Sequence, residues 1–227
     1  DFRARALQVL ARELPGRTVY GVGGSGFYIQ ALEKGMFDVP KPAPEAEAKI
    51  RQLRPEDLYG ILKSRDPEYA AELNPNDQYR ITRALIIIED SGKTVSALKR
   101  DFKPKPFPYP LLKLGLASSR EELLPRVETR ARQMLEEGWL EEVRGLLADG
   151  FGDWPALRSV GYHECLKYLN GEIPEAKLLP LIVEKTMQLS KKQRTWFRRD
   201  PEIHWLDPHN PLGKARELIE NFRYRRS

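Results

Sequence analysis

The sequence contains a single cysteine, Cys165, among its 227 residues. One cysteine can form neither an internal disulfide nor a cysteine-rich zinc site, and such sparse use is typical of a reducing compartment. No run of apolar residues approaches the roughly 18 that a membrane-spanning helix needs. We therefore expect a cytoplasmic protein with no membrane partner and no metal site of its own.

The sequence also has only a small excess of one sign of charge. The chain has 38 lysines and arginines against 33 aspartates and glutamates, which gives a net charge of +5. With so small an excess, the placement of the basic residues matters more than their sum. The length and the hydrophobic content of 41% fit one large globular domain, or a core domain with an insertion.

Buried strands are few in this sequence. Only 18–22, 111–116 and 203–206 have the apolar, β-branched character of buried strands. Parallel sheets usually contain more strands than three. The sequence also starts at Asp1 inside an amphipathic helical pattern, so we expect further strands upstream of Asp1.

Glycines cluster where the first predicted strand, 18–22, meets a predicted helix over 27–34. Glycines let the backbone approach another group closely, and a helix N-terminus offers free N–H groups to an anion. Ser25 adds a hydroxyl within this cluster. We interpret the segment as one wall of a site that handles phosphate or a nucleotide.

Two other interpretations of the glycine cluster remain open. Its spacing, Gly21-x-Gly23-x-x-Gly26, formally matches a dinucleotide-binding fingerprint. That fingerprint requires a second strand and an acidic residue about 20 positions on, whereas this chain runs into prolines 40, 42 and 44. Alternatively, the glycines form a tight turn that allows close packing of a helix on a sheet.

Residues 38–110 show helical patterns only. We expect helices over 44–53, 55–64, 67–73 and 78–90, followed by a proline-rich return linker over 101–110. The pattern predicts an all-helical insertion, 38–110, between two parts of an α/β core, 1–37 and 111–227.

Two pairs of arginines lie on predicted helices. Arg80 and Arg83 are three residues apart and can project from one face, either as a clamp on a phosphate backbone or as a solvated basic edge. Arg126 and Arg130 are four apart, and two guanidinium groups one turn apart suit a diphosphate.

The helix that carries Arg126 and Arg130 begins with a predicted capping box, Ser119-x-x-Glu122, and extends to about residue 137. The alternative for the two arginines is exposed charge that pairs with Glu122 or Glu128.

Two later segments combine basic and aromatic residues. The loop-to-helix segment 157–163 contains Arg, Ser, Gly, Tyr and His, which can hydrogen-bond phosphates and stack on a base. A long helix from about Pro174 ends in the segment 191–199, with five cations and two aromatic residues. Such a mixture suits a nucleic-acid groove, although cations at a helix C-terminus also favour the helix dipole.

Four segments, in this order, resemble the tRNA dimethylallyltransferases (the tRNA isopentenyltransferase family). They are Val22–Tyr28, VGGSGFY; Asn76–Leu85, NDQYRITRAL; Ser159–Tyr162, SVGY; and Lys191–Arg198, KKQRTWFR. Each motif alone is modest, but four in order at compatible separations are a strong signal. The resemblance covers nearly the whole chain.

The resemblance implies a P-loop-kinase-like α/β core with a helical insertion that contacts the tRNA anticodon arm. It implies transfer of a dimethylallyl group from dimethylallyl diphosphate to the exocyclic amine of the adenosine beside the tRNA anticodon, with Mg²⁺ as cofactor, by a monomeric enzyme. It assigns Ser25 and Arg130 to the catalytic site and Arg130 to the diphosphate, and the spacing of the two arginines adds Arg126 to the diphosphate site. The implied tRNA contacts are Ser25, Tyr79, Arg80, Ile81, Thr82, Arg83, Arg158, Ser159, Val160, Gly161, Tyr162, His163, Lys191, Lys192, Gln193, Arg194, Thr195, Trp196, Phe197 and Arg198.

The sequence departs from the family pattern in several places. The family's P-loop and catalytic aspartate would lie upstream of Asp1, so we expect residues 1–227 to lack the main diphosphate cradle and the general base. Glu47 stands where many relatives have arginine, and His163 replaces a more usual Arg or Lys. Two alternatives stay open: a prenyltransferase that acts on free adenine nucleotide, and an RNA-binding module without catalysis.

Overall fold

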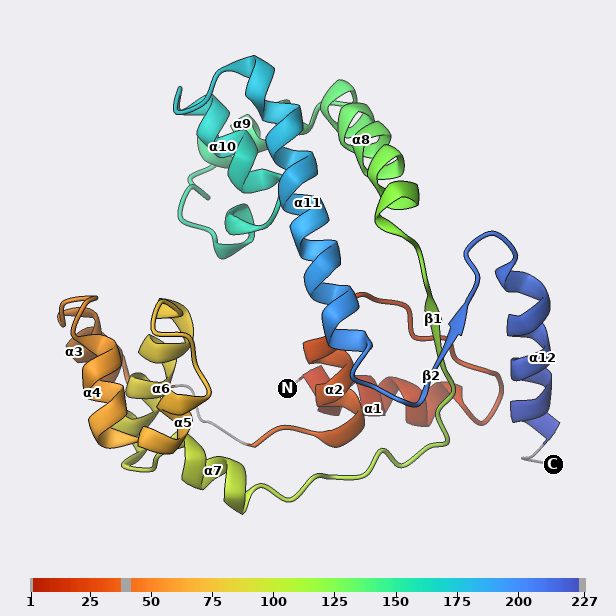
Figure 1. Ribbon diagram of the computed structural model, residues 1–227, viewed down its shortest axis with the longest axis horizontal. Helices are drawn as coiled ribbons and strands as arrows, with labels where there is room; N and C mark the ends of the chain where they lie inside the picture. The colour runs from red at the N-terminus through yellow and green to blue at the C-terminus, as the bar shows by residue number, and fades with distance from the viewer. Residues whose placement is uncertain (1, 38–41, 225–227) are drawn as a thin grey trace. The chain divides into compact units, whose positions relative to one another are not determined.

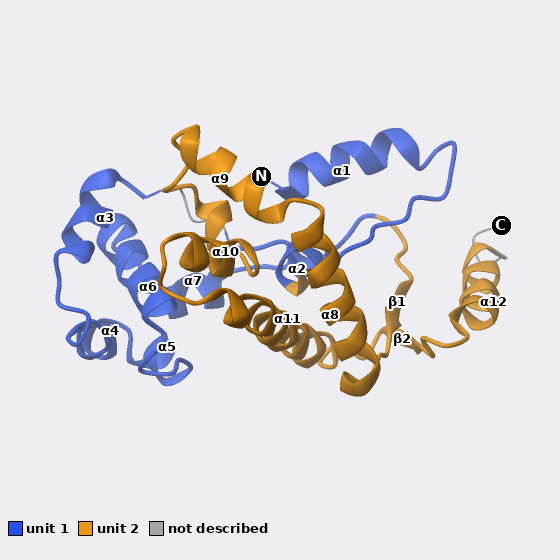
Figure 2. Cartoon of the chain, turned by 90° about the horizontal axis from the view of Figure 1, so that it is seen from above, with its two compact units in different colours: residues 1–23, 27–108 blue, residues 24–26, 109–227 orange. Residues whose placement is uncertain are grey.

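The computed structural model describes residues 2–37 and 42–224, and the chain divides into two compact units (Figure 2). Unit 1 holds residues 1–23 and 27–108, and unit 2 holds residues 24–26 and 109–227. A separate hydrophobic core stabilises each unit. The predicted division into a catalytic core and an insertion over 38–110 stays a prediction.

Unit 1 begins with two helices, α1 (Phe2–Glu13) and α2 (Gly26–Lys34), of which α2 starts at the junction with unit 2. Their aromatic residues meet, with the rings of Phe2 and Tyr28 4.8 Å apart. The guanidinium of Arg3 donates to the carbonyl of Leu32 (3.0 Å) and to that of Lys105 (2.8 Å). Arg3 therefore joins α1, α2 and the return linker.

The remainder of unit 1 is a block of five helices (Figure 1). They are α3 (Pro44–Arg51), α4 (Leu58–Arg65), α5 (Pro67–Ala71), α6 (Gln78–Ser91) and α7 (Val95–Asp101). Leu62, Ile81 and Leu85 are fully buried at its centre, and each such side chain contributes roughly 1.5–3 kcal/mol of transfer free energy. The predicted helical character of this block is confirmed.

Two details of the block differ from the sequence prediction. Helix α4 begins at Leu58 rather than Pro55, because a turn over 54–57 precedes it, with the Asp57 N–H bonded to the Arg54 carbonyl. Helix α7 was not predicted. Its signal in the sequence is Thr94, whose hydroxyl accepts from the Ala97 N–H and caps the helix.

The predicted strand over 18–22 is wrong: these residues form no strand in the structure. A strand needs a neighbour to accept and donate its backbone hydrogen bonds. Within the part of the chain that the structure describes, none lies beside this segment. Tyr20 is 67% exposed and Val22 is 98% exposed, so most of the apolar run that suggested a buried strand lies at the surface.

Unit 2 contains the described sheet, a pair of parallel strands. β1 (Lys113–Leu116) lies beside β2 (Ile203–Leu206), with Lys113 opposite Ile203 and Leu116 opposite Leu206. The ammonium of Lys113 lies 2.7 Å from the Asp200 carboxylate and 2.6 Å from that of Glu202. These two strands match predictions 111–116 and 203–206.

Helices connect the two strands, as a parallel pair requires. The chain passes through α8 (Arg120–Glu136), α9 (Trp139–Ala148), the short 3₁₀ helix η1 (Pro155–Arg158), α10 (Tyr162–Leu169) and α11 (Glu175–Phe197), and ends with α12 (Pro211–Tyr224). Ala131, Trp139, Val143, Cys165, Leu178 and Ile182 form the buried core between α8, α9, α10 and α11. Helix α8 packs along α11 (Figure 1).

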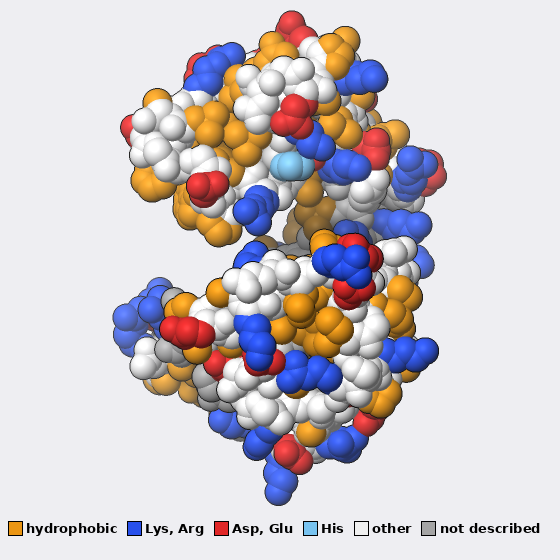
Figure 3. All heavy atoms as spheres, turned by 90° about the vertical axis from the view of Figure 1, so that its left-hand side faces the viewer, with side chains coloured by type: hydrophobic (Ala, Val, Ile, Leu, Met, Phe, Trp, Pro, Cys, Tyr) orange, Lys and Arg blue, Asp and Glu red, His pale blue; other side chains and the backbone are white. Residues whose placement is uncertain are grey.

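The described residues therefore form a mixed α/β protein, mostly helical, with a short parallel sheet. No helix among them is both long and apolar enough to cross a membrane. On the face drawn in Figure 3, lysine and arginine side chains are interspersed with acidic and apolar ones instead of gathering into one basic patch. The net charge therefore does not identify a binding surface on this face.

Candidate functional site

Helix α8 starts with the capping box that the sequence predicts. The Ser119 hydroxyl accepts from the Glu122 N–H (3.2 Å), and the Glu122 carboxylate accepts from the Ser119 N–H (2.8 Å). This reciprocal pair fixes the first turn of the helix. Arg126 and Arg130 follow on the exposed side, one turn apart.

Neither Arg126 nor Arg130 pairs with a carboxylate among the described residues. Glu128 instead pairs with Arg132 at 3.1 Å, and the Glu122 side chain contacts both the capping backbone and His209. The alternative that these two arginines pair with Glu122 or Glu128 is therefore wrong. Two cationic groups are left available on one face of α8.

A surface depression of about 400 Å³ lies along this face of α8, and Arg126 and Arg130 line it together with Pro125, Thr129 and Gln133. Ser25 does not line it. All five lining residues belong to one helix, so the depression is a shallow surface rather than an enclosed tunnel. A catalytic site that includes both Ser25 and Arg130 would need a cavity shared by the two, and such a cavity stays a prediction.

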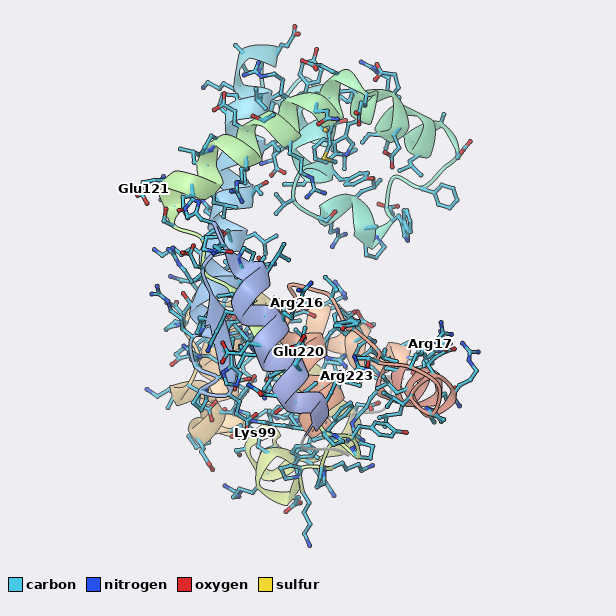
Figure 4. The ribbon with its side chains drawn as sticks, turned by 90° about the vertical axis from the view of Figure 1, so that its right-hand side faces the viewer. Arg17, Lys99, Glu121, Arg216, Glu220 and Arg223 are labelled. Carbon is cyan, nitrogen blue, oxygen red and sulfur yellow. The ribbon has the colours of Figure 1, made fainter. Side chains whose placement is uncertain are left out.

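The basic and aromatic segment 191–198 forms the C-terminal end of α11, which stops at Phe197, with Arg198 as its C-cap. Lys191, Lys192 and Arg198 are exposed, while Gln193 and Arg194 are half-buried. Hydrogen bonds from its own backbone and from Ser119, together with the charges of Arg120 and Arg194, lower the pKa of Glu121. Glu121 lies at the start of α8 (Figure 4), so the first turn of α8 is close to Arg194 of α11.

The glycine turn that holds Ser25 packs on the same part of α11. Residues 24–26 belong to unit 2 although both flanking segments belong to unit 1. Gly26 is buried against Trp196, and Gly24 approaches Gln193. The Ser25 side chain is exposed. The structure thus brings together two of the predicted site segments that are farthest apart in the sequence.

The segment 158–163 links η1 to α10. The Ser159 hydroxyl donates to the Ala156 carbonyl at 2.6 Å, and the buried Gly161 turns the chain at a φ of +94°. A Cβ atom at Gly161 would overlap the ring of Trp139, so this position requires glycine for both its conformation and its contact. Arg158 and His163 remain exposed on this turn.

The side chain of Tyr162 helps to support this turn. Its hydroxyl donates to the Glu142 carboxylate at 2.6 Å, and its ring meets that of Trp139 edge-on with centroids 5.6 Å apart. The hydrogen bond to Glu142, with burial, raises the pKa of Tyr162 above its ordinary value of 10.0. Trp139 and Glu142 were missed in the sequence, where the break at Gly138 followed by tryptophan was the available signal.

Two buried groups lie directly beneath the turn. The Glu164 carboxylate accepts from the Gly161 N–H at 2.6 Å and so caps the first turn of α10. Burial, with the charges of Glu164 and Glu142, raises the pKa of the Cys165 thiol to about 11. A thiol with so high a pKa is a poor nucleophile at neutral pH, so Cys165 is a core residue.

The predicted contacts in unit 1 surround the start of α6. Asp77 caps the helix by accepting from the Arg80 N–H at 3.1 Å, and its carboxylate lies 3.4 Å from the Arg80 guanidinium. Tyr79 is 81% exposed. Ile81, by contrast, is fully buried in the core, so its side chain supports the helix and is not available to a ligand.

The described residues offer no ready metal site. No group of three or more His, Cys, Asp or Glu side chains among them lies close enough to hold a metal ion. Mg²⁺ favours carboxylate and phosphate oxygens with several waters. We therefore assign no magnesium ligand among the described residues.

Comparison with known proteins adds to this geometry. The family model described as IPP transferase matches residues 1–200. A tRNA dimethylallyltransferase of Bdellovibrio bacteriovorus is 40% identical over 226 residues, which cover 96% of this chain and 73% of that protein.

Two solved structures are also similar. The full-length tRNA isopentenylpyrophosphate transferase of Bacillus halodurans is 28% identical with a TM-score of 0.62, over 99% of this chain and 71% of that one. A eukaryotic dimethylallyltransferase acting on tRNA has a TM-score of 0.73 over 97% of this chain and 61% of its own; at 22% identity, this likeness shows the fold alone. The predicted α/β fold class is confirmed by these likenesses.

Proposed function

The chain belongs to the IPP transferase family, and from this premise we propose that it transfers a dimethylallyl group from dimethylallyl diphosphate to tRNA. The acceptor is the exocyclic amine of the adenosine adjacent to the anticodon. The relatives from Bdellovibrio bacteriovorus and Bacillus halodurans are enzymes of this kind, which supports the proposal. A tRNA substrate also implies that the protein works in the cytoplasm, and we propose that it does so as a monomer.

The observation that carries the proposal is the pair of unpaired guanidinium groups on α8. Arg126 and Arg130 line one depression and have no carboxylate partner among the described residues. An arginine fork binds phosphate oxygens in a bidentate manner, and a pair one turn apart can hold both phosphates of a diphosphate. Charge develops on these oxygens as the diphosphate leaves, so the same groups stabilise the transition state more than the ground state.

The RNA is proposed to bind through side chains of both units, largely by contacts to phosphate. The exposed members of the predicted set are Ser25, Tyr79, Arg80, Arg158, Ser159, His163, Lys191, Lys192, Thr195, Trp196 and Arg198. Arg83 and Thr82 are half-buried beside them on α6. The amine of adenine is inaccessible inside a base stack, and an enzyme that modifies it must take the base out of the stack.

Two parts of the chemistry have no assigned group in this chain. The amine proton must pass to a base, and we assign no general base among the described residues. The magnesium requirement rests on the resemblance alone.

The test is prenyl transfer by the intact protein to an anticodon stem-loop that carries the target adenosine. We expect turnover with the stem-loop, none with a variant loop that has guanosine at that position, and no competition from AMP at equal concentration. Preferential use of AMP would establish the adenylate-specific alternative instead. Binding of tRNA with a steep salt dependence but no turnover would establish a binding module and reject the proposal.

A further inference from the structure

The four glycines around Ser25 are not equivalent. A Cβ atom added to Gly21 or Gly23 would meet nothing within 4 Å. At Gly24 it would lie 2.5 Å from Nε2 of Gln193, and at Gly26 it would overlap the indole of Trp196. None of the four has a positive φ, so their backbone conformation does not require glycine. At Gly24 and Gly26, side chains of α11 occupy the space that a Cβ atom would need.

The two contacts also differ in how easily the α11 side chain can move away. Nε2 of Gln193 is the far end of a flexible side chain and can move aside at small cost. The indole of Trp196 is a rigid ring, and the overlap at Gly26 involves its Cδ1, Nε1 and Cγ atoms, which lie next to the helix. Trp196 cannot yield without leaving its rotamer. Gly26 is therefore the firmer of the two contact points.

Ser25 lies between these two contact points. Its side chain is exposed, and its hydroxyl makes no hydrogen bond to another described residue. Nothing on the Ser25 side chain itself therefore fixes the position of the hydroxyl. The backbone on each side lies against α11, with Gln193 next to Gly24 and Trp196 next to Gly26.

We propose that Trp196, assisted by Gln193, is a positioning residue that sets the place of the Ser25 hydroxyl through the Gly24–Gly26 turn. The inference rests on the proposed function, in which Ser25 belongs to the catalytic site and contacts the tRNA. In this proposal, Trp196 is a side chain that supports the Gly24–Gly26 turn and not a contact on which a base stacks. A shift of about 1 Å in a group that orients a substrate can lower a rate by about 100-fold.

Direct contact with RNA is the competing role for Trp196, which is 40% exposed. The two roles predict different kinetics. A stacking residue contributes to tRNA affinity, so its loss raises the Kd for tRNA. A positioning residue acts on the reacting geometry, so its loss lowers kcat and leaves the Kd nearly unchanged.

The experiment compares alanine at two glycines of the same segment in the intact protein. Gly26→Ala places a methyl group against Trp196, and we expect kcat to fall about 100-fold with the tRNA Kd within about twofold of wild type. Gly21→Ala is the matched control, because its methyl group meets nothing within 4 Å, and its kcat should be unchanged.

A double variant separates lost positioning from misfolding. Replacing the indole in Gly26→Ala/Trp196→Val makes room for the methyl group, and we expect about tenfold recovery of kcat over Gly26→Ala alone. Trp196→Phe should retain a higher kcat than Trp196→Ala, because a flat ring still occupies the space next to Gly26. A Trp196→Ala variant with a raised tRNA Kd and unchanged kcat would overturn the proposal, as would a Gly26→Ala variant as active as Gly21→Ala.

A spectroscopic readout keeps this test distinct from that of the proposed function. In protein labelled with 5-fluorotryptophan, Trp196→Phe identifies the Trp196 signal by ¹⁹F NMR. Gly26→Ala should shift that signal and Gly21→Ala should not. An unshifted signal rejects the contact whatever the enzyme does, and absence of prenyl transfer by the wild-type protein rejects the proposed function while the shift still reports the contact.

Discussion

The arginine pairs of α6 and α8 look alike in the sequence and differ in the structure. Both follow a capped helix start. On α6, the capping carboxylate of Asp77 also faces Arg80, at 3.4 Å. On α8, the nearby carboxylates are engaged by the capping backbone, by His209 and by Arg132, and among the described residues Arg126 and Arg130 have none.

This difference shows that the position of the carboxylates, more than the spacing of the arginines, decides which guanidinium groups can bind a ligand. A spacing of three or four residues predicts only a shared face. On α6 the opposite face is a buried core, so the helix presents Tyr79, Arg80 and Arg83 from a rigid support, as binding an RNA backbone requires. On α8 the arginines line a shallow surface depression and have no carboxylate partner among the described residues, which leaves them available to an anion.

The largest expected effect is that of removing a guanidinium from α8. Arg130→Ala should lower kcat by roughly 100- to 1,000-fold, because a group that stabilises the leaving diphosphate acts mainly in the transition state. The measurement is steady-state transfer to the anticodon stem-loop. Arg132→Ala is the matched control on the same helix, and its kcat should remain within about twofold. Equal losses in both variants would remove the distinction between paired and unpaired arginines.

Substitution on α6 should affect binding and not chemistry. Arg83→Ala should weaken tRNA binding roughly tenfold and reduce the slope of log Kd against log salt by about one. At saturating tRNA, kcat should stay the same. Arg80→Ala should have the smaller effect on affinity, because Arg80 already faces Asp77. Salt titrations of tRNA binding measure both, and a lower kcat with an unchanged slope would contradict the assignment.

The helix caps should make equal contributions to folding. Asp77→Ala removes the acceptor of the Arg80 N–H, and Ser119→Ala removes that of the Glu122 N–H. Each should lower the free energy of unfolding by about 1 kcal/mol, measured by urea denaturation. Glu128→Gln, which breaks only the exposed pair with Arg132, should change it by less than about 0.5 kcal/mol.

The smallest expected effect is a pH dependence confined to α8. Hydrogen bonds from the Ser119 backbone and from His209 lower the pKa of Glu122 below its ordinary value of 4.5. A carboxyl group with a lowered folded-state pKa stabilises the folded state above its unfolded pKa, and this stability is lost as the pH falls through the folded value.

The first turn of α8 should therefore fray as the pH falls below the ordinary glutamate pKa of 4.5. Hydrogen exchange of the amides at 120–123 measures it, with Glu122→Gln as the comparison. Fraying at the same pH in that variant would show that protonation of Glu122 is not the cause.

Local signals predicted most of the fold. The capping residues Asp66, Asp77 and Ser119 mark helix starts that the structure confirms. The strands 111–116 and 203–206 were also predicted, because each is a short apolar run. In the structure, each of the two finds its partner in the other. The run at 18–22 has the same composition but no described partner. Composition reports the capacity to form a strand, and only tertiary pairing decides whether one forms.

The candidate site was predictable as motifs but not as an arrangement. The basic and aromatic character of 191–198 is visible in the sequence, while its contact with the glycine turn is not, because the two lie more than 160 residues apart. Ile81 is the opposite case. It falls inside a motif with exposed neighbours, yet its side chain points into the core, as the helical period alone would indicate.

The central claim is that Arg126 and Arg130 hold a diphosphate, and inhibition by inorganic diphosphate tests it most directly. The inhibition constant should be measured for the wild type, Arg126→Ala, Arg130→Ala and Arg132→Ala under identical salt. We predict a rise of about tenfold or more in the first two variants and no change in Arg132→Ala. Equal inhibition constants in all four proteins would contradict the account.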